Sequence, residues 1–153
     1  MQKQTMHFST VINAPTRKVW DTMLQDATYR EWTTPFNPTG SSWYEGDWSQ
    51  GSRIHFLGTG KDGKVAGMVS QIRENRPYEF VWIEHLGVVQ DGQEDTTSDF
   101  ATQWAPAFEN YTFIDKGERT EVRVDMDVVE EHRQMFEESW PKALLKLKQL
   151  AEE

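Results

Sequence analysis

The feature that most constrains the fold is an unbroken alternation of apolar and charged side chains at residues 120–128. The apolar positions are Val122, Val124, Met126 and Val128, and a charged residue precedes each of them. Because successive side chains of a strand point to opposite faces, this pattern predicts a strand with one face on a core and the other in water. The chain must therefore form a sheet that has one covered face.

A second long pattern lies at the C-terminal end. Apolar side chains recur there three or four positions apart, which is typical of one face of a helix: Phe136, Trp140, Ala143, Leu144, Leu147, Leu150 and Ala151. We expect a helix over residues 131–151 whose apolar face covers the sheet. Pro141 lacks a backbone N–H and predicts a kink or a new helix start near residues 139–141.

The remaining segments fill in an α+β layout. Residues 5–13 read as a strand, and residues 15–24 and 26–32 as two short helices. Further strands are expected within 43–45, 52–58, 65–74, 79–88 and 109–115, with a short helix at 98–104. We expect a single domain, residues 1–153, in which a curved antiparallel sheet wraps around the long C-terminal helix.

Composition excludes several classes of function. A net charge of −9 argues against nucleic acid and anionic membrane surfaces as partners. The chain has no cysteine, no long apolar run and no secretory signal, so we expect no membrane insertion and a cytoplasmic location. Its four scattered histidines lack metal-ligand spacing, and no nucleotide-binding or nucleophile motif is present. We therefore expect no metal, no cofactor and no catalytic residue of a familiar motif.

Seven tryptophans in 153 residues are an unusual number. Large aromatic side chains bury much area each, so they can build a core by themselves. They can also line a pocket, because ligand sites are mostly apolar and aromatic with a few polar groups. Both interpretations stay open from composition alone.

The last hairpin allows the strand register to be predicted. A two-residue turn at Gly117 and Glu118 places Phe113 opposite Val122 and Tyr111 opposite Val124. Both aromatic side chains then point inward, with Glu109 on the same side. The phenol of Tyr111 is a polar group in an apolar space and needs a partner there.

The strand at 79–88 carries two adjacent titratable residues, Glu84 and His85. Trp82 and Glu84 share one face and His85 the other, so either Glu84 or His85 points to the concave side of the sheet. A buried carboxylate or imidazole is suited to proton transfer or to fixing a ligand. It can equally be a satisfied structural polar group.

Five segments carry a resemblance to a known superfamily. They are Ile12-Asn-Ala-Pro15 with Val19-Trp20, Trp43 with Gly46, Gly67-x-Val69-x-x-Ile72 closing at Pro77, Gly117-x-x-Thr120-x-Val122, and Trp140-x-x-x-Leu144-x-x-Leu147. In this order the chain resembles the START/birch-pollen-allergen-like (SRPBCC) superfamily, and within it the activator of heat-shock-protein-90 ATPase homologue branch. The resemblance implies a helix-grip fold and a ligand cavity, without shared catalytic residues.

Three hypotheses for function follow. The preferred one is a small-molecule binding domain, whose internal hydrophobic cavity takes a lipid-like or aromatic ligand; its candidate lining residues are Trp82, Glu84, His85, Tyr111, Phe113, Val124, Phe136 and Trp140. The second is a cyclase- or dehydratase-type enzyme that uses Glu84 or His85 with Tyr111 for acid–base chemistry. The third, suggested by the resemblance, is a co-chaperone-like module whose acidic segment 91–99 meets a basic chaperone surface. The sequence leaves open whether the chain is a monomer or a homodimer.

Overall fold

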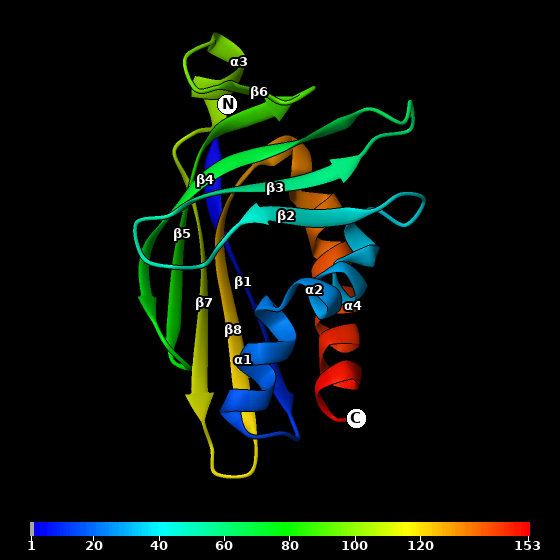
Figure 1. The fold of residues 1–153 in the computed structure, drawn as a ribbon, viewed down its shortest axis with the longest axis vertical. Helices are drawn as coiled ribbons and strands as arrows, with labels where there is room; N and C mark the ends of the chain where they lie inside the picture. Colours follow the sequence, from blue (N-terminus) through cyan, green and yellow to red (C-terminus); the bar gives the residue numbers. More distant parts are fainter. Residues whose placement is uncertain (1) are drawn as a thin grey trace.

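A curved antiparallel sheet wraps around one long helix in the computed structural model, which describes residues 2–153 (Figure 1). The strands are β1 (Lys3–Ile12), β2 (Ser42–Gly46), β3 (Arg53–Thr59), β4 (Val65–Arg76), β5 (Phe80–Gln90), β6 (Gln93–Asp95), β7 (Ala107–Asp115) and β8 (Thr120–Val129). The helices are α1 (Thr16–Leu24), α2 (Asp26–Trp32), α3 (Asp99–Trp104) and α4 (Arg133–Ala151), with short 3-10 turns η1 (Thr34–Phe36) and η2 (Glu130–His132).

The sheet has the strand order β1-β8-β7-β5-β4-β3-β2, and β6 pairs with the C-terminal end of β5. All neighbouring strands are antiparallel. The last hairpin has the predicted register, with Tyr111 opposite Val124 and Phe113 opposite Val122. Gly117 begins its turn with a φ of +86°, a conformation that glycine adopts without strain.

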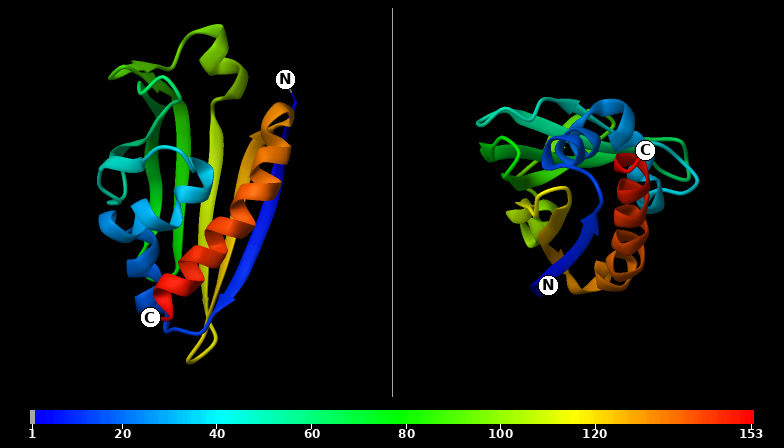
Figure 2. Two further views of the ribbon diagram at one scale, coloured as in Figure 1. Left: turned by 90° about the vertical axis from the view of Figure 1, so that its right-hand side faces the viewer. Right: turned by 90° about the horizontal axis from the view of Figure 1, so that it is seen from below.

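The core lies between the concave face of the sheet and α4. Figure 2 shows α4 crossing the sheet diagonally, with the strands curving around it. The helix contributes buried Trp140, Ala143, Leu144 and Leu147, and α1, α2 and η1 pack against it as well. This arrangement confirms the predicted α+β helix-grip architecture.

Two local features differ from the sequence-based expectation. The helix α4 runs without interruption through Pro141, so the alternative of a new helix start at 139–141 is wrong. Packing of Trp140 and Leu144 on the core holds both sides of the proline in one helix. The Glu137 carbonyl that loses its N–H partner belongs to an exposed residue, where water can replace that partner.

The other difference is a β-bulge between β4 and β5. Val69 lies opposite Gly87 while Ser70 lies opposite His85, so Leu86 has no partner. Because of this extra residue, the side chains of β5 that follow the bulge lie on the other face of the sheet from the one that continued alternation would give. Leu86 and Val69 pack with Leu57 into a second, smaller apolar cluster.

Candidate functional site

Four polar side chains form a connected chain inside the apolar core. Ser70 Oγ lies 2.7 Å from His85 Nδ1, and His85 Nε2 lies 3.1 Å from Glu109 Oε1. The hydroxyl of Tyr111 donates to the other carboxylate oxygen of Glu109. Ser70 is fully buried, and His85 and Tyr111 are nearly so. We call these four residues the polar chain.

Strand register brings the polar chain together. It runs across β4, β5 and β7, which are neighbours in the sheet. Glu109 lies opposite Ile83, and Tyr111 opposite Val81, so both share the concave face with His85. The bulge completes the set because it places Ser70 directly beside His85.

Aromatic rings enclose His85. The indole of Trp104, at the end of α3, stacks on the imidazole with 5.5 Å between ring centroids and an interplanar angle of 21°. Phe56 contacts the same ring edge-on at 6.0 Å. Tyr111 meets the indole of Trp140 at 6.3 Å. The polar chain is therefore surrounded by the faces and edges of large apolar groups.

The two interior phenols stay protonated. Burial raises the pKa of Tyr111 well above 10, and the negative charge of Glu109 adds to that shift. Burial and then the charge of Glu109 also raise the pKa of Tyr29, which comes from α2. The Tyr111 hydroxyl therefore acts as a donor to Glu109.

With Tyr111 protonated, the hydrogen-bond donors and acceptors of the polar chain can be assigned. Tyr111 donates to Glu109, and His85 donates to the same carboxylate through Nε2. In neutral imidazole Nδ1 is then an acceptor, and it receives the Ser70 hydroxyl. Every donor has an acceptor, so the chain can persist in an apolar interior without an unpaired group.

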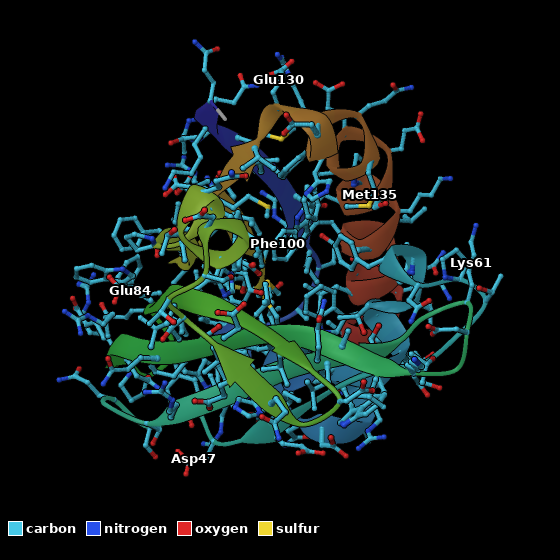
Figure 3. The ribbon with its side chains drawn as sticks, turned by 90° about the horizontal axis from the view of Figure 1, so that it is seen from above. Asp47, Lys61, Glu84, Phe100, Glu130 and Met135 are labelled. Atoms are coloured by element: carbon cyan, nitrogen blue, oxygen red, sulfur yellow. The ribbon has the colours of Figure 1, made fainter. Side chains whose placement is uncertain are left out.

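Glu109 is the most exposed member of the polar chain. The Glu109 side chain is 13% exposed, against 4% for that of His85. The same end of the molecule carries two large exposed apolar side chains, Phe100 on α3 and Met135 on α4 (Figure 3), which are 62% and 46% exposed. This end thus carries a partly accessible carboxylate and two exposed apolar side chains.

The structure places the eight predicted site residues in three groups. His85 and Tyr111 belong to the polar chain. Phe113, Val124 and Trp140 are buried on the same face of the interior, and half-buried Phe136 packs beside them. Trp82 and Glu84 lie on the opposite face of β5, so they do not join this set.

The contacts of that opposite face explain the separation. Trp82 packs on Phe108 with 5.7 Å between ring centroids. Glu84 lies 3.8 Å from Arg73 and points away from α4 (Figure 3). Of the pair Glu84 and His85, the histidine is thus the one that faces inward, because Val81 and Ile83 on its face are fully buried.

Sequence reasoning missed several residues of this region as site candidates. Glu109 was detectable, since it alternates with Tyr111 and Phe113 on one face. Ser70, Tyr29 and Trp104 give no such signal. Their positions depend on the bulge and on how α2 and α3 pack against the sheet.

Two hollows in the surface of the described residues lie elsewhere. One, of about 590 Å³, is open at the surface and is lined by Asn13, Ala14, Pro15, Lys116, Glu118 and Arg119. Another, of about 340 Å³, lies between β1 and α4 and is lined by Phe8, Ser9, Thr10, Pro141, Leu144 and Leu145. Neither includes a member of the polar chain.

Two further absences hold for the described part of the chain. No three histidine, aspartate or glutamate side chains gather as a metal site would require. None of its helices combines the length and apolar character needed to cross a bilayer.

The acidic segment at 91–99 is built into the fold. Glu94 accepts from His55 at 2.6 Å and from Arg53 at 3.1 Å, and these hydrogen bonds lower the pKa of Glu94. Asp95 accepts from Ser98, whose hydroxyl in turn caps α3 by accepting from Ala101 N. At least two of the four acids in this segment therefore have structural partners.

Comparison with known structures supports the fold. Protein NE0264 from Nitrosomonas europaea is similar, with a TM-score of 0.74 at 12% identity over 95% of this chain and 92% of that one. CV1439 from Chromobacterium violaceum has a TM-score of 0.71 at 14% identity, covering 98% and 99%. ChR145 from Cytophaga hutchinsonii has a TM-score of 0.70 at 20% identity, covering 99% and 97%.

Sequence comparison identifies the family. No curated protein matches the chain. The family model described as "Activator of Hsp90 ATPase homolog 1-like protein" matches residues 13–152, which is nearly the whole chain. The chain therefore belongs to the Activator of Hsp90 ATPase homolog 1-like family.

Proposed function

We propose that this protein binds a small molecule with an apolar, aromatic-compatible body and one polar group, at the end of the interior where Trp104 covers the polar chain. The observation that carries the proposal is the polar chain itself, a set of hydrogen-bonding groups in an otherwise aromatic core. Well-packed apolar side chains would stabilise such a core at least as well. A binding role gives these polar groups a purpose beyond stability.

Accessibility supports the same location. Glu109 is the member of the polar chain that solvent reaches most, and Phe100 and Met135 are exposed apolar side chains at that end. A ligand entering there would displace the stacked indole of Trp104 from His85 and keep the imidazole covered by an aromatic surface.

Binding is favoured over catalysis by the position of Ser70. Serine, histidine and carboxylate are in hydrogen-bond contact, as a nucleophilic site would require. However, Ser70 is fully buried behind His85, so its hydroxyl has no path to a substrate in this conformation.

Calorimetric titration with 1-naphthalenemethanol, an aromatic alcohol, tests the proposal. We expect saturable binding at one site, weakened in Tyr111→Phe because the chain loses a donor to Glu109. The matched control is His55→Gln, since His55 also pairs with a glutamate but on the outer face of the sheet. No saturable binding, or equal loss in both variants, would refute the proposal.

A further inference from the structure

The strand β1 forms an open edge of the sheet. It pairs with β8, and the register from Lys3 with Val129 to Ile12 with Thr120 runs without a bulge. Among residues 2–153, no backbone–backbone hydrogen bond outside this ladder involves residues 3–11. Figure 2 shows β1 at the border of the sheet, beside α4. The outward N–H and C=O groups of β1 are therefore available to another strand.

This edge lacks the features that keep exposed strands apart. Edge strands are usually short, or they carry charges, prolines or bulges that prevent pairing with another chain. β1 is ten residues long and has no proline and no acidic residue. Its one lysine, Lys3, donates to the carbonyl oxygens of Trp104 and Pro106 at 3.2 and 2.7 Å. The strand at the opposite border, β2, has five residues and carries Glu45, so β1 is the edge better suited to pairing.

Apolar surface lies beside the middle of the same edge. The hollow of about 340 Å³ between β1 and α4 is lined on the strand side by residues 8–10. Leu145, which lines the same hollow from α4, is 54% exposed, and Val11 on the outer face of β1 is 39% exposed. Met6 and Phe8 pack against the core and are only partly buried. A further strand on this edge would remove apolar surface from water.

Charge favours a second copy of this chain as the partner. The molecule carries a net charge of −9, so two copies repel each other over much of their surface. No acidic residue precedes Asp21, and the titratable side chains of β1 are those of Lys3 and His7. Two β1 edges can therefore meet without bringing acidic side chains directly opposite each other.

We propose that two copies of the chain pair through β1 in antiparallel orientation, so that their sheets become continuous across a two-fold axis. Directly opposed residues of an antiparallel pair point to the same face. Odd-numbered positions must therefore oppose odd-numbered ones for both α4 helices to lie on the same side of the joined sheet.

Strand length and charge select the register within this arrangement. With Phe8 on the two-fold axis, nearly the whole of β1 is paired, and Thr5 lies opposite Val11 of the second copy. With His7 on the axis, two imidazoles would lie directly opposite each other. In the Phe8-centred register the hollow at residues 8–10 lies next to the axis in both copies, which covers apolar surface of each.

Sedimentation equilibrium of the wild-type chain over a range of concentrations tests the pairing, and we expect a concentration-dependent dimer. The double variant Thr5→Lys with Val11→Lys should raise the dimer dissociation constant about tenfold or more, because two lysine pairs then oppose each other across the axis. Within one copy these positions lie opposite Asp127 and Glu121 of β8, so the fold accommodates the added lysines, which circular dichroism checks.

The matched control is Thr39→Lys with Gln90→Lys, which adds the same charge at two exposed positions outside β1. This variant should dimerise as the wild type does. A wild-type chain that stays monomeric at every concentration would overturn the pairing. So would a dimer that the β1 double variant retains in full, or one that both double variants weaken equally.

Discussion

Tyr111 joins the two kinds of contact that make up the interior. Its ring packs on Trp140 with centroids 6.3 Å apart, and its hydroxyl donates to Glu109. Since burial raises its pKa, the phenol serves as a donor throughout the physiological range. One residue thus connects the aromatic core to the polar chain.

Because the pKa of Tyr111 is raised in the folded state, we expect the free energy of unfolding to fall at alkaline pH. A group with a raised pKa in the folded state contributes stability that is complete below its unfolded pKa, near 10, and that is lost as pH rises above it. The slope approaches about 1.4 kcal/mol per pH unit for each such tyrosine. Urea unfolding between pH 9 and 11 should give a flatter pH dependence for Tyr111→Phe than for wild type. Parallel curves would contradict the assignment.

Ser70 tests whether the polar chain acts as a structural unit. Ser70→Ala leaves His85 Nδ1 without its donor in a buried position, and we expect a loss of about 1 to 3 kcal/mol in the free energy of unfolding. His55→Gln removes a hydrogen bond to Glu94 between side chains that are 25% and 35% exposed, and should cost about 1 kcal/mol or less. Equal shifts of the urea midpoint in the two variants would show that a buried hydrogen bond of the polar chain contributes no more to stability than an exposed one.

At the scale of elements, α4 shows how packing overrides local propensity. Pro141→Ala restores a backbone N–H for the Glu137 carbonyl in an uninterrupted helix. Proline costs about 3 kcal/mol in a helix interior, although it also restricts the unfolded chain. We therefore expect thermal unfolding to show a net gain of about 1 to 2 kcal/mol. A loss of stability would mean that the proline ring itself is required where α4 meets β1.

A close contact between β5 and the last residue of β6 lies next to the start of α3, the helix that carries Trp104. A Cβ on Gly87 would come 2.1 Å from the Asp95 carbonyl oxygen, which no side chain tolerates. Asp95 also holds Ser98, the cap of the helix that carries Trp104. Gly87→Ala should displace this segment, cost about 1 to 3 kcal/mol and weaken binding of 1-naphthalenemethanol. Unchanged affinity in calorimetry would show that Trp104 does not cover the site.

The sequence predicts these elements well where one periodicity is sustained. Alternation at 120–128 and the stripe at 136–151 correspond to β8 and α4, and the hairpin register places Tyr111 as expected. The short strand β6 is not predicted from the sequence, because its three residues lie in an acidic segment that shows no periodic pattern. The bulge beside Ser70 is not predicted either, because a register shift depends on how two strands pair and not on the pattern of one strand.

The site was therefore only partly predictable. The hairpin register predicts that Tyr111 points inward. Alternation along β5 shows that Glu84 and His85 lie on opposite faces, but only the packed sheet shows that His85 is the inward one. Trp104 and Tyr29 come from helices whose docking depends on tertiary contacts far along the chain.

At the scale of the whole molecule, the two ends of the fold differ. Near the C-terminus, α4 packs against α1 and α2, whereas the opposite end carries α3 and the exposed side chains of Phe100 and Met135 (Figures 1 and 3). The net charge of −9 gives the molecule a field that attracts cations.

Native mass spectrometry of the protein purified gently from its native host shows directly whether this end of the interior holds a small molecule. We expect an extra mass on the wild-type chain that extracts into organic solvent, is retained by Glu84→Gln and is lost from Glu109→Gln. A bare mass for the wild-type protein, or an extra mass that Glu109→Gln retains in full, would contradict this expectation.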